Sequence, residues 1–540
     1  MKLLVANRGE IAVRIIRGCR EMGIETVAVY SEVDRRSPHV LMADQAFPIG
    51  PAAASESYLD IDRLLAAADA SGANLVHPGY GFLAENADFA ERVEAAGLTW
   101  VGPPAAAITL MGSKTESRKL AVDTGVPLIP GMVEPLENFA ELEAFVDQHG
   151  LPVLLKAVAG GGGKGMREVH ERHDLAAFFD RARSEGGAYF GDDRVYVERL
   201  VKQARHIEVQ VAADKHGNAV YLGERECSIQ RRHQKVVEEC PSPVVDADLR
   251  RRLGEAALAI VRGSGYQSVG TVEFLVDGDG DFYFLEMNTR LQVEHPVTEE
   301  VYGVDLVREM INLALGRELS WRQEDLFPRG HAIECRVYAE DPLRNFAPSP
   351  GRISLLVRPS GPGIRVDSGV FQGSVVPLDY DPMVAKLVVH APDRPAAVAR
   401  LRRALQEYQL RGIATTLTLF RALVEMDEFA EADFHTGFLD ELLASQRLEE
   451  LHGLQDPEAE EAAVVAAVCL ATLEAGEVSG DPYSHGEGSH WWQVGARQQH
   501  GRYPICSGSF VKETRVTRLR SSGYAMASRS SWIPSADGWI

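Results

Sequence analysis

The chain has 540 residues, of which 45% are hydrophobic and 25% are charged, a composition typical of a soluble globular protein. At roughly 150 residues for each domain, it has room for about three to four domains. The formal net charge of -22 argues against non-specific binding to nucleic acid or to an anionic membrane surface, because both repel an acidic protein.

The spacing of the cysteines and the length of the apolar runs argue against a disulfide-rich, zinc-binding, secreted or membrane-spanning protein. The six cysteines are scattered and form no C-x-x-C pair, so neither a disulfide framework nor a zinc site is expected. The polar segment 7–10 interrupts the apolar start of the chain, which argues against a signal peptide. The most apolar later run, 462–473, is shorter than the ~20 residues of a membrane span. We therefore expect a cytoplasmic protein.

Segment 1–82 predicts the start of a doubly wound α/β unit. Residues 2–6 form a buried strand, a helix with Ala12, Ile15 and Ile16 on its apolar face follows, and residues 26–30 form a second strand. The three glycines of a dinucleotide fingerprint are absent, so a nicotinamide site is not supported. Segment 75–82 is a strand that runs into a Pro/Gly turn, where a functional site and a plain structural turn are equally compatible with the residues.

A second α/β stretch begins near residues 111–114 and carries a glycine run. The predicted strand 153–156 places Lys156 in an apolar context, and residues 160–165 follow with four glycines, Lys164 and Gly165. Backbone N–H groups of such a run can donate hydrogen bonds to nucleotide phosphates. The run is not a Walker A loop, because the Lys-Ser/Thr pair of that motif is absent. A linker or hinge is the alternative for a glycine run alone. The two lysines favour a mobile flap that covers phosphates.

Segment 224–235 is rich in cations and follows strands predicted at 195–200, 205–211 and 219–222. It contains Arg225, Arg231, Arg232 and Lys235. A solvated charge run is the usual explanation for such a segment. In an acidic chain, a basic cluster between strands also makes a local anion site.

After a helix predicted at 247–263, the segment 273–296 predicts a hairpin with a turn at residues 277–280. Side chains alternate along a strand, so a polar row from Glu286 to Glu294 would share one face for as long as the strand stays regular. Glu286 and Asn288, with Glu273 of the partner strand, offer hard oxygen ligands of the kind that magnesium takes. The planar guanidinium group of Arg290 can donate two parallel hydrogen bonds to a small oxyanion. A solvated strand face with an incidental ion pair is the alternative.

The remaining elements complete the core near residue 443. Strands are predicted at 330–337, which carries Arg336 as a second oxyanion or enolate ligand, and at 379–388, followed by a helix with Val398 and Leu401 on its apolar face. The amino-acid composition changes after this point. An Ala/Val-rich helix is predicted at 458–474, and after Arg502 the composition becomes basic and Ser-rich, which favours disorder or an incomplete fold.

Six segments in this order closely resemble the biotin carboxylase family of the ATP-grasp superfamily: 6–12, 77–81, 111–114, 160–163, 230–239 and 286–299. The resemblance implies an α/β and α+β fold. Its parts are an N-terminal doubly wound, Rossmann-like pre-ATP-grasp domain (1–112), an ATP-grasp domain (113–328) with a mobile glycine-rich lid at about 130–203, and a C-terminal biotin carboxylase β/α domain (329–445). Residues 446–540 would be a linker with part of a connecting region.

The resemblance also implies a role for each matching residue. The residues expected at ATP are Lys114, Lys156, Gly162, Gly163, Met166, Glu198, Arg199, Leu200, Val201, His206, Gln230, His233, Glu273, Leu275 and Glu286. Magnesium or manganese is expected at Glu273, Glu286 and Asn288. Bicarbonate is expected at Lys235, Arg290, Gln292, Val293 and Glu294, with Glu294 as its general base. Biotin is expected at Tyr80, Gly81 and Arg336, and Arg336 would stabilise its enolate.

The implied reaction is the ATP- and bicarbonate-dependent carboxylation of biotin through carboxyphosphate, the first half-reaction of an acyl-CoA carboxylase in fatty acid synthesis or propionyl-CoA metabolism. Biotin would be supplied on a carrier protein or domain, because the Met-Lys-Met acceptor of larger family members does not occur in these 540 residues. A carboxyltransferase subunit and a second copy of the chain are the other expected partners. The acyl-CoA substrate depends on the carboxyltransferase and cannot be read from this sequence.

Two other functions are compatible with part of the pattern. Another ATP-grasp ligase would share the magnesium residues, but segments 230–239 and 290–294 favour biotin. An inactive scaffold subunit acting through Trp491 and Trp492 conflicts with the intact set of lysines, carboxylates and arginines. For the sequence after about residue 502, composition favours a truncated or frame-shifted end over a divergent native tail.

Overall fold

The computed structural model describes residues 1–132, 134–158, 166–445, 447–448 and four short strands between residues 511 and 533. The chain divides into two compact units, Met1–Ser445 and Gln446–Ile540. The expected phosphate-covering residues Gly162 and Gly163 lie outside the described residues, as do the predicted helix 458–474 and Trp491 and Trp492.

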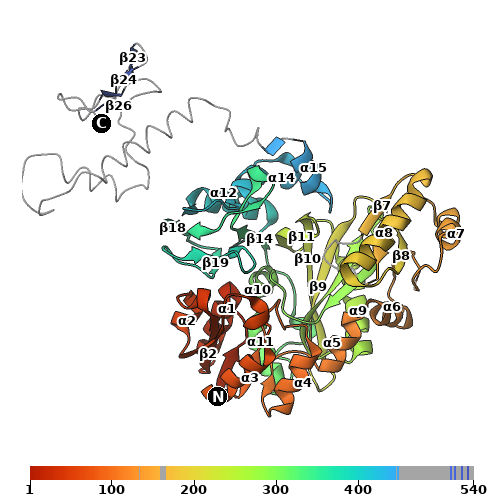
Figure 1. Ribbon diagram of the computed structural model, residues 1–540, viewed down its shortest axis with the longest axis horizontal. Coiled ribbons are helices and arrows are strands. Elements are labelled where there is room, and N and C mark those ends of the chain that lie inside the picture. Colours follow the sequence, from red (N-terminus) through yellow and green to blue (C-terminus); the bar gives the residue numbers. More distant parts are fainter. Residues whose placement is uncertain are drawn as a thin grey trace, which may run out of the picture. The chain divides into compact units, whose positions relative to one another are not determined.

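A five-stranded parallel sheet of order β3-β2-β1-β4-β5 forms the first part of the chain, as the β-α-β pattern predicts (Figure 1). Successive strand residues point to opposite faces, so Leu3 and Val5 enter one hydrophobic core while Leu4 enters another on the opposite face. The elements are β1 Lys2–Val5, α1 Gly9–Glu21, β2 Glu25–Ser31, α2 Pro38–Met42, β3 Gln45–Gly50, α3 Ile61–Ser71, β4 Leu75–His77, α4 Ala87–Ala95, β5 Thr99–Trp100 and α5 Ala105–Gly112.

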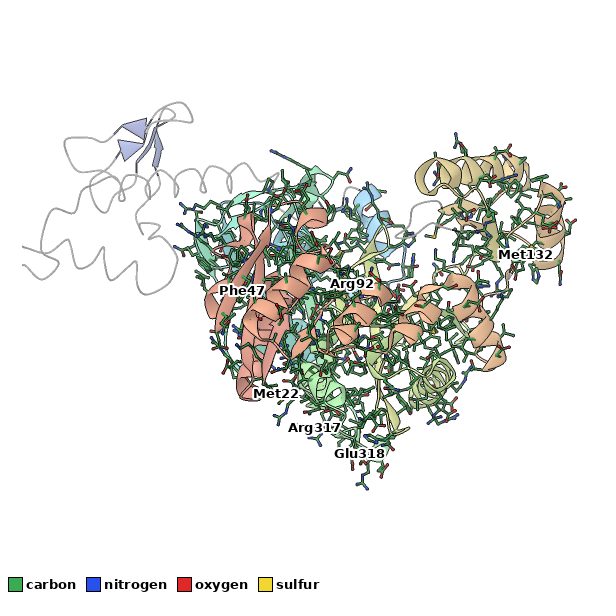
Figure 2. The ribbon with its side chains drawn as sticks, turned by 60° about the horizontal axis from the view of Figure 1, so that its bottom comes forward. Met22, Phe47, Arg92, Met132, Arg317 and Glu318 are labelled. Atoms are coloured by element: carbon green, nitrogen blue, oxygen red, sulfur yellow. The ribbon has the colours of Figure 1, made fainter. Side chains whose placement is uncertain are left out.

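A three-stranded sheet of order β7-β6-β8 forms a separate small lobe with its own core, which includes Leu142, Leu155 and Val197. Helices α7 and α8 lie beside its strands at one side of the first unit in Figure 1. In Figure 2, Met132 marks this lobe, and Met22 and Phe47 mark the distant parallel sheet. The elements of the lobe are α7 Phe139–His149, β6 Val153–Ala157, β7 Met166–Val169, α8 Leu175–Phe190 and β8 Val195–Arg199. Helix α6 Lys114–Asp123 precedes the lobe in the chain, and its Ala121 belongs to the core that contains Phe284.

An eight-stranded antiparallel sheet of order β13-β12-β9-β10-β11-β14-β21-β19 forms the centre of the unit. It crosses the domain boundary predicted at 328/329, because β11 pairs with β14 from Val237↔Cys335 to Cys240↔Ala332. Its strands are β9 Arg205–Ala213, β10 Ala219–Arg231, β11 Gln234–Cys240, β12 Ser268–Val276, β13 Phe282–Asn288, β14 His331–Tyr338, β19 Ile364–Ser368 and β21 Met383–Ala391.

Helices and short strand pairs accompany this sheet and complete the unit. The helices are α9 Ala247–Ser264, α10 His295–Tyr302, α11 Leu306–Ala314, α12 Arg394–Glu407, α13 Leu417–Leu423, α14 Asp427–Ala430 and α15 Phe438–Ala444. The strand pairs are β15 Glu340–Asp341 with β16 Ala347–Pro348, β17 Gly351–Arg352 with β20 Val375–Val376, and β18 Leu355–Val357 with β22 Gln409–Arg411.

The interpretation of segment 224–235 as a basic cluster between strands is wrong. The segment is a hairpin of β10 and β11, whose two-residue turn places Arg232 and His233 at φ of 49° and 65°, as a type I′ turn requires. Arg225 has no exposed surface, and Lys235 is 9% exposed. Burial of these two charges is possible because each forms an ion pair with Glu208 of a neighbouring strand. The local sequence does not indicate this ion-pair partner.

In the second unit, the described residues form the antiparallel sheet β23-β24-β25-β26, in a region predicted to be disordered or incompletely folded. The strands are β23 Val511–Glu513, β24 Val516–Arg518, β25 Ala525–Met526 and β26 Trp532–Ile533. Across all described residues, we find no helix with the length and apolar character needed to traverse a bilayer.

Candidate active site

Carboxylates from three strands line one face of the large sheet. Glu286 of β13 stands opposite Glu273 of β12, because a register shift between Glu273 and Phe274 moves the pairing by one residue from the register next to the turn. Glu273 stands opposite Glu208 of β9, and Glu208 stands opposite Arg225 of β10. Directly opposite residues of neighbouring strands project from the same face, so three acidic side chains lie in one row. Such a row is stable only with cations beside it.

Lys235 supplies the central cation of this row. Its Nζ donates to Glu273 Oε1 at 2.8 Å, to Glu294 Oε1 at 2.7 Å and to Glu208. Burial by itself would lower the pKa of Lys235, but the three carboxylates outweigh it and raise this pKa well above its ordinary value. Lys235 is therefore a permanently charged ammonium inside the protein.

Glu294 is held between two cations immediately before α10. Its second oxygen, Oε2, accepts from Arg336 Nη2 at 2.8 Å, while Oε1 accepts from Lys235. Burial would raise the pKa of Glu294, but Lys235, Arg336 and Arg225 hold it well below its ordinary value. The carboxylate is ionised at neutral pH and can accept a proton from a bound substrate.

Arg290 and Gln292 lie in the loop between β13 and α10, because the strand ends at Asn288. The Arg290 guanidinium donates from Nη2 to Asn288 Oδ1 at 3.0 Å and from Nη1 to Gln292 Oε1 at 3.1 Å. Its Nε donates to Glu85 Oε2 at 2.9 Å, and Glu85 also accepts from the Thr289 N–H at 3.1 Å. The loop geometry, rather than strand alternation, brings this arginine to the site.

Glu273, Glu286 and Asn288 suit a magnesium ion. Two like charges at opposite positions of a ladder repel each other, and a divalent cation between them would remove that repulsion. Asn288 Nδ2 donates to Glu273 Oε1 at 2.8 Å, so the amide adjoins the carboxylates, and all three residues offer oxygen ligands. Glu286 is exposed, which leaves this side open to a nucleotide-bound ion.

A second acidic group does not suit a metal. The ligating atoms of His206, Glu208 and Glu273 lie within 4.8 Å of one another. Lys235 Nζ already bonds to both carboxylates, so an ammonium takes the position that a metal would need. His206 Nε2 lies 3.0 Å from Glu273 Oε2; burial would lower the pKa of His206, but Glu273 raises it above its ordinary value.

The residues expected at the nucleotide are divided between the small lobe and the large sheet. Lys156 of β6 and Arg118 of α6 both pair with the buried Glu198 of β8. Lys114 is the first residue of α6, which Ser113 caps through the Glu116 N–H at 3.3 Å. On the lobe, Met166 lies at the start of β7, and Arg199, Leu200 and Val201 lie at and after the end of β8. The remaining residues are on the large sheet: His206, Gln230, Glu273, Leu275 and Glu286, with His233 in the exposed β10–β11 turn.

The residues expected at biotin come from different parts of the chain. Tyr80 and Gly81 lie in the loop after β4, where Gly81 has φ of 67°, and Arg336 lies on β14. The Arg336 side chain is held on both sides: its Nε donates to Glu238, and its Nη2 donates to Glu294. Both of these carboxylates are buried.

Sequence reasoning missed three residues of this cluster, Glu208, Glu238 and Glu85, and it named Arg225 only as part of a basic segment. Strand alternation could have singled out Glu208 and Arg225, because each is a charged residue at a position that shares a face with buried neighbours. No local pattern indicates Glu85, which lies 205 residues before its partner Arg290.

Family models match three successive parts of the chain. The model described as biotin carboxylase, N-terminal domain, matches residues 1–108, and that of the biotin carboxylase C-terminal domain matches residues 334–441. Between them, the model of the carbamoyl-phosphate synthase L chain, ATP binding domain, matches residues 113–322. These matches confirm the expected fold class, while the predicted domain boundaries remain a prediction.

Curated relatives and solved structures agree with these matches. Biotin carboxylase 1 of Bacillus subtilis is 49% identical over 440 residues, which cover 81% of this chain and 98% of that protein. The biotin carboxylase domain dimer of the Hydrogenobacter thermophilus 2-oxoglutarate carboxylase, solved with MgADP, ADP and bicarbonate, superposes with a TM-score of 0.78 at 44% identity, covering 82% of this chain and 97% of that one.

The propionyl-CoA carboxylase alpha chain of Ruegeria pomeroyi is 47% identical over 559 residues, covering 99% of this chain and 81% of that protein. This alignment extends into residues 446–540.

Proposed function

The chain belongs to the biotin carboxylase family, and from this premise we propose that its buried cluster of Lys235, Glu294 and Arg336 carboxylates biotin with bicarbonate and ATP. One observation carries the proposal. Glu294 is an ionised carboxylate held between two cations, at the end of the loop that also presents Arg290 and Gln292. This arrangement supplies a base and an oxyanion site within one short segment.

MgATP is the first substrate, and residues on both sides of the site would hold it. Lys114 and Lys156 neutralise its phosphates, and Gly162 and Gly163 cover them. Glu273, Glu286 and Asn288 would hold the magnesium ion, which offsets charge on the triphosphate as its terminal phosphoryl group is transferred. The lysines and the lid position that group in line with the second substrate.

Bicarbonate is the nucleophile. Arg290, Lys235, Gln292 and the backbone of Val293 hold it, and Glu294 accepts the proton of its hydroxyl group. The freed oxygen attacks the γ-phosphorus, the bond to the β–γ bridging oxygen breaks, and ADP and carboxyphosphate result. The low pKa of Glu294 keeps the base ionised before each turnover.

Biotin is carboxylated in the second step. Carboxyphosphate breaks at its C–O bond to phosphate and carbon dioxide, and the phosphate takes the N1 proton of biotin. The N1 nitrogen then attacks carbon dioxide to give carboxybiotin. Arg336 stabilises the negative charge that develops on the ureido oxygen, and its bonds to Glu238 and Glu294 keep the guanidinium in place.

Biotin reaches this site on a carrier protein or domain, and a carboxyltransferase then uses the carboxybiotin. The similarity to carboxylase alpha chains supports both partners, and the dimer of the Hydrogenobacter domain supports a homodimer. Among the described residues, Cys19, Cys227, Cys240 and Cys335 are buried and unbridged, which supports a reducing cytoplasm. Residues 446–540 serve as a linker and connecting region.

The first test is ADP release by the purified protein with free biotin as acceptor. We expect release to depend on both biotin and bicarbonate and to yield acid-labile carboxybiotin. Ammonia dependence in place of biotin dependence would indicate a carbamoyl-phosphate type of ATP-grasp ligase. Loss of all nucleotide turnover in a folded, MgATP-binding protein would support the scaffold alternative.

A further inference from the structure

Residues 7–10 lead from β1 into α1 and contact the loop after β4 that carries Tyr80, a contact that the reaction outlined above does not use. Asn7 Nδ2 donates to Pro78 O at 2.6 Å and to Tyr80 O at 2.8 Å, so it holds the backbone of the loop after β4. Glu10, in the first turn of α1, accepts a hydrogen bond from the Tyr80 hydroxyl through Oε1. Asn7 and Glu10 therefore orient both the backbone and the ring of Tyr80.

The same carboxylate meets a buried lysine from the far part of the chain. Lys386 of β21 has no exposed surface, and its Nζ lies 3.0 Å from Glu10 Oε1. Nζ also donates to the backbone carbonyl of Val293 at 2.7 Å and lies 5.9 Å from the centre of the Tyr80 ring. One ammonium thus joins the first helix, the Tyr80 loop and the loop that contains Glu294.

The carbonyl contact exceeds what charge balance requires. Lys386 stands opposite Asp367 on β19 and opposite Arg336 on β14, and Glu10 is its ion-pair partner. Asp367 is itself paired with Arg365 at 2.8 Å, so Glu10 is the carboxylate that compensates the ammonium. The further contact is to a neutral carbonyl at the centre of the Gln292–Glu294 loop, which adds no charge and therefore indicates a positional role.

We propose that Lys386 and Glu10 are positioning residues that set Tyr80 and the Val293 loop at a fixed mutual distance, and so align the biotin and bicarbonate sites. The inference rests on the proposed function, because it assigns substrates to those two segments. Lys386 and Glu10 themselves touch neither substrate. A shift of about 1 Å between reacting groups can cost on the order of 100-fold in rate, so a rigid tie between the sites has a measurable effect.

The test is the Lys386→Met variant of the full chain, with initial rates of ADP release measured against each substrate in turn. We expect kcat/KM for bicarbonate and for free biotin to fall about 10- to 100-fold. We expect KM for MgATP to stay within about twofold, because no residue of the Lys386 network is assigned to the nucleotide. Tyr80→Phe, which removes only the hydroxyl, should raise KM for biotin and leave KM for bicarbonate near that of the parent.

Two further variants separate position from charge balance. Glu10→Gln combined with Lys386→Met removes both charges, so its stability should recover relative to Lys386→Met while kcat/KM for bicarbonate stays low. Arg250→Met is the control: it breaks a partly buried ion pair with the buried Glu224 (2.7 Å) elsewhere in the unit and should lower stability without changing KM for bicarbonate.

Two results with these variants would overturn the positioning role of Lys386 and Glu10. If Lys386→Met retains parent kinetics, or if the double variant recovers kcat/KM for bicarbonate together with stability, the positioning role is overturned. If the parent chain itself lacks biotin- and bicarbonate-dependent ADP release, the proposed function fails instead. These two failures are distinguished by the parent assay alone.

Discussion

At the scale of single residues, the site depends on how its charges are paired. The pKa of Glu294 lies well below its ordinary value because Lys235 and Arg336 contact its two oxygens, although burial acts in the opposite direction. Arg336, in turn, is shared between Glu294 and Glu238. Each group therefore owes its protonation state and its position to neighbours on other strands, and a substitution at one of them changes the others.

Glu294→Gln keeps the shape of the side chain and removes the base. We expect bicarbonate-dependent ADP release to fall at least 100-fold, the usual contribution of a general base. MgATP binding, measured by calorimetry, should stay near the parent value, because Glu294 has no assigned contact to the nucleotide. Lys235 and Arg336 lose a charged partner, so a modest loss of stability is also expected.

Glu91→Gln, an exposed residue of α4, serves as the control for a change of one charge. A Glu294→Gln protein that turns over bicarbonate at the parent rate would show that another group takes the proton.

At the scale of elements, the pairing of β11 with β14 places Glu238 directly opposite Glu334, and both are fully buried. Burial raises the pKa of Glu238 to about 7 although Arg336 opposes the shift, and burial raises the pKa of Glu334 well above its ordinary 4.5. Neither oxygen of Glu334 has a hydrogen-bond partner among the described residues. Two like charges at directly opposite positions repel each other, so this arrangement favours the protonated form of Glu334 in the folded protein.

Glu334→Gln should therefore stabilise the protein increasingly as the pH rises. The folded state keeps a proton on Glu334 that the unfolded chain releases above about pH 4.5, so the parent loses stability as the pH rises from that value toward the raised pKa. Glutamine needs no proton. One pKa unit corresponds to about 1.4 kcal/mol, and we expect the stability difference between variant and parent to grow by at least that amount between pH 5 and pH 8.

Urea unfolding at a series of pH values measures this difference, with Glu94→Gln on the surface of α4 as the control. A difference that is independent of pH would mean that Glu334 is ionised in the folded protein.

At the scale of the whole unit, the eight-stranded sheet joins segments that the domain prediction separates. Strands β9 to β13 precede residue 328, and β14, β19 and β21 follow it, yet one ladder connects them. Arg336 and Glu238 pair across this junction with Glu294 beside them, so the site itself lies where the two segments meet. Folding of either segment alone would leave buried charges without partners.

Hydrogen exchange can test this coupling. We expect the backbone amides of β11, β12, β14 and β21 to exchange with similar opening free energies, because one cooperative unit contains all four strands. Exchange measured by mass spectrometry on the full chain gives these values strand by strand, and the small lobe around β6 and β8, with its separate core, should exchange faster. Free exchange of β14 and β21 while β11 and β12 stay protected would show that the junction is not cooperative.

Much of this protein follows from the sequence alone. Period-two and helical patterns predicted β1, α1, β2, β6, α9, β12, β13, β14 and α12 because those elements bury apolar faces. The predicted hairpin put Glu273 and Glu286 on partner strands, but their direct pairing depends on a register shift between Glu273 and Phe274 that the sequence pattern did not indicate. Six motifs indicated the family because their residue types match the chemistry of the site. The tertiary structure alone showed that Arg225 and Lys235 are buried, that Glu85 holds Arg290, and that Lys386 connects Glu10 to Val293. Those contacts join residues up to hundreds of positions apart, and burial of a charge depends on partners that no local pattern specifies.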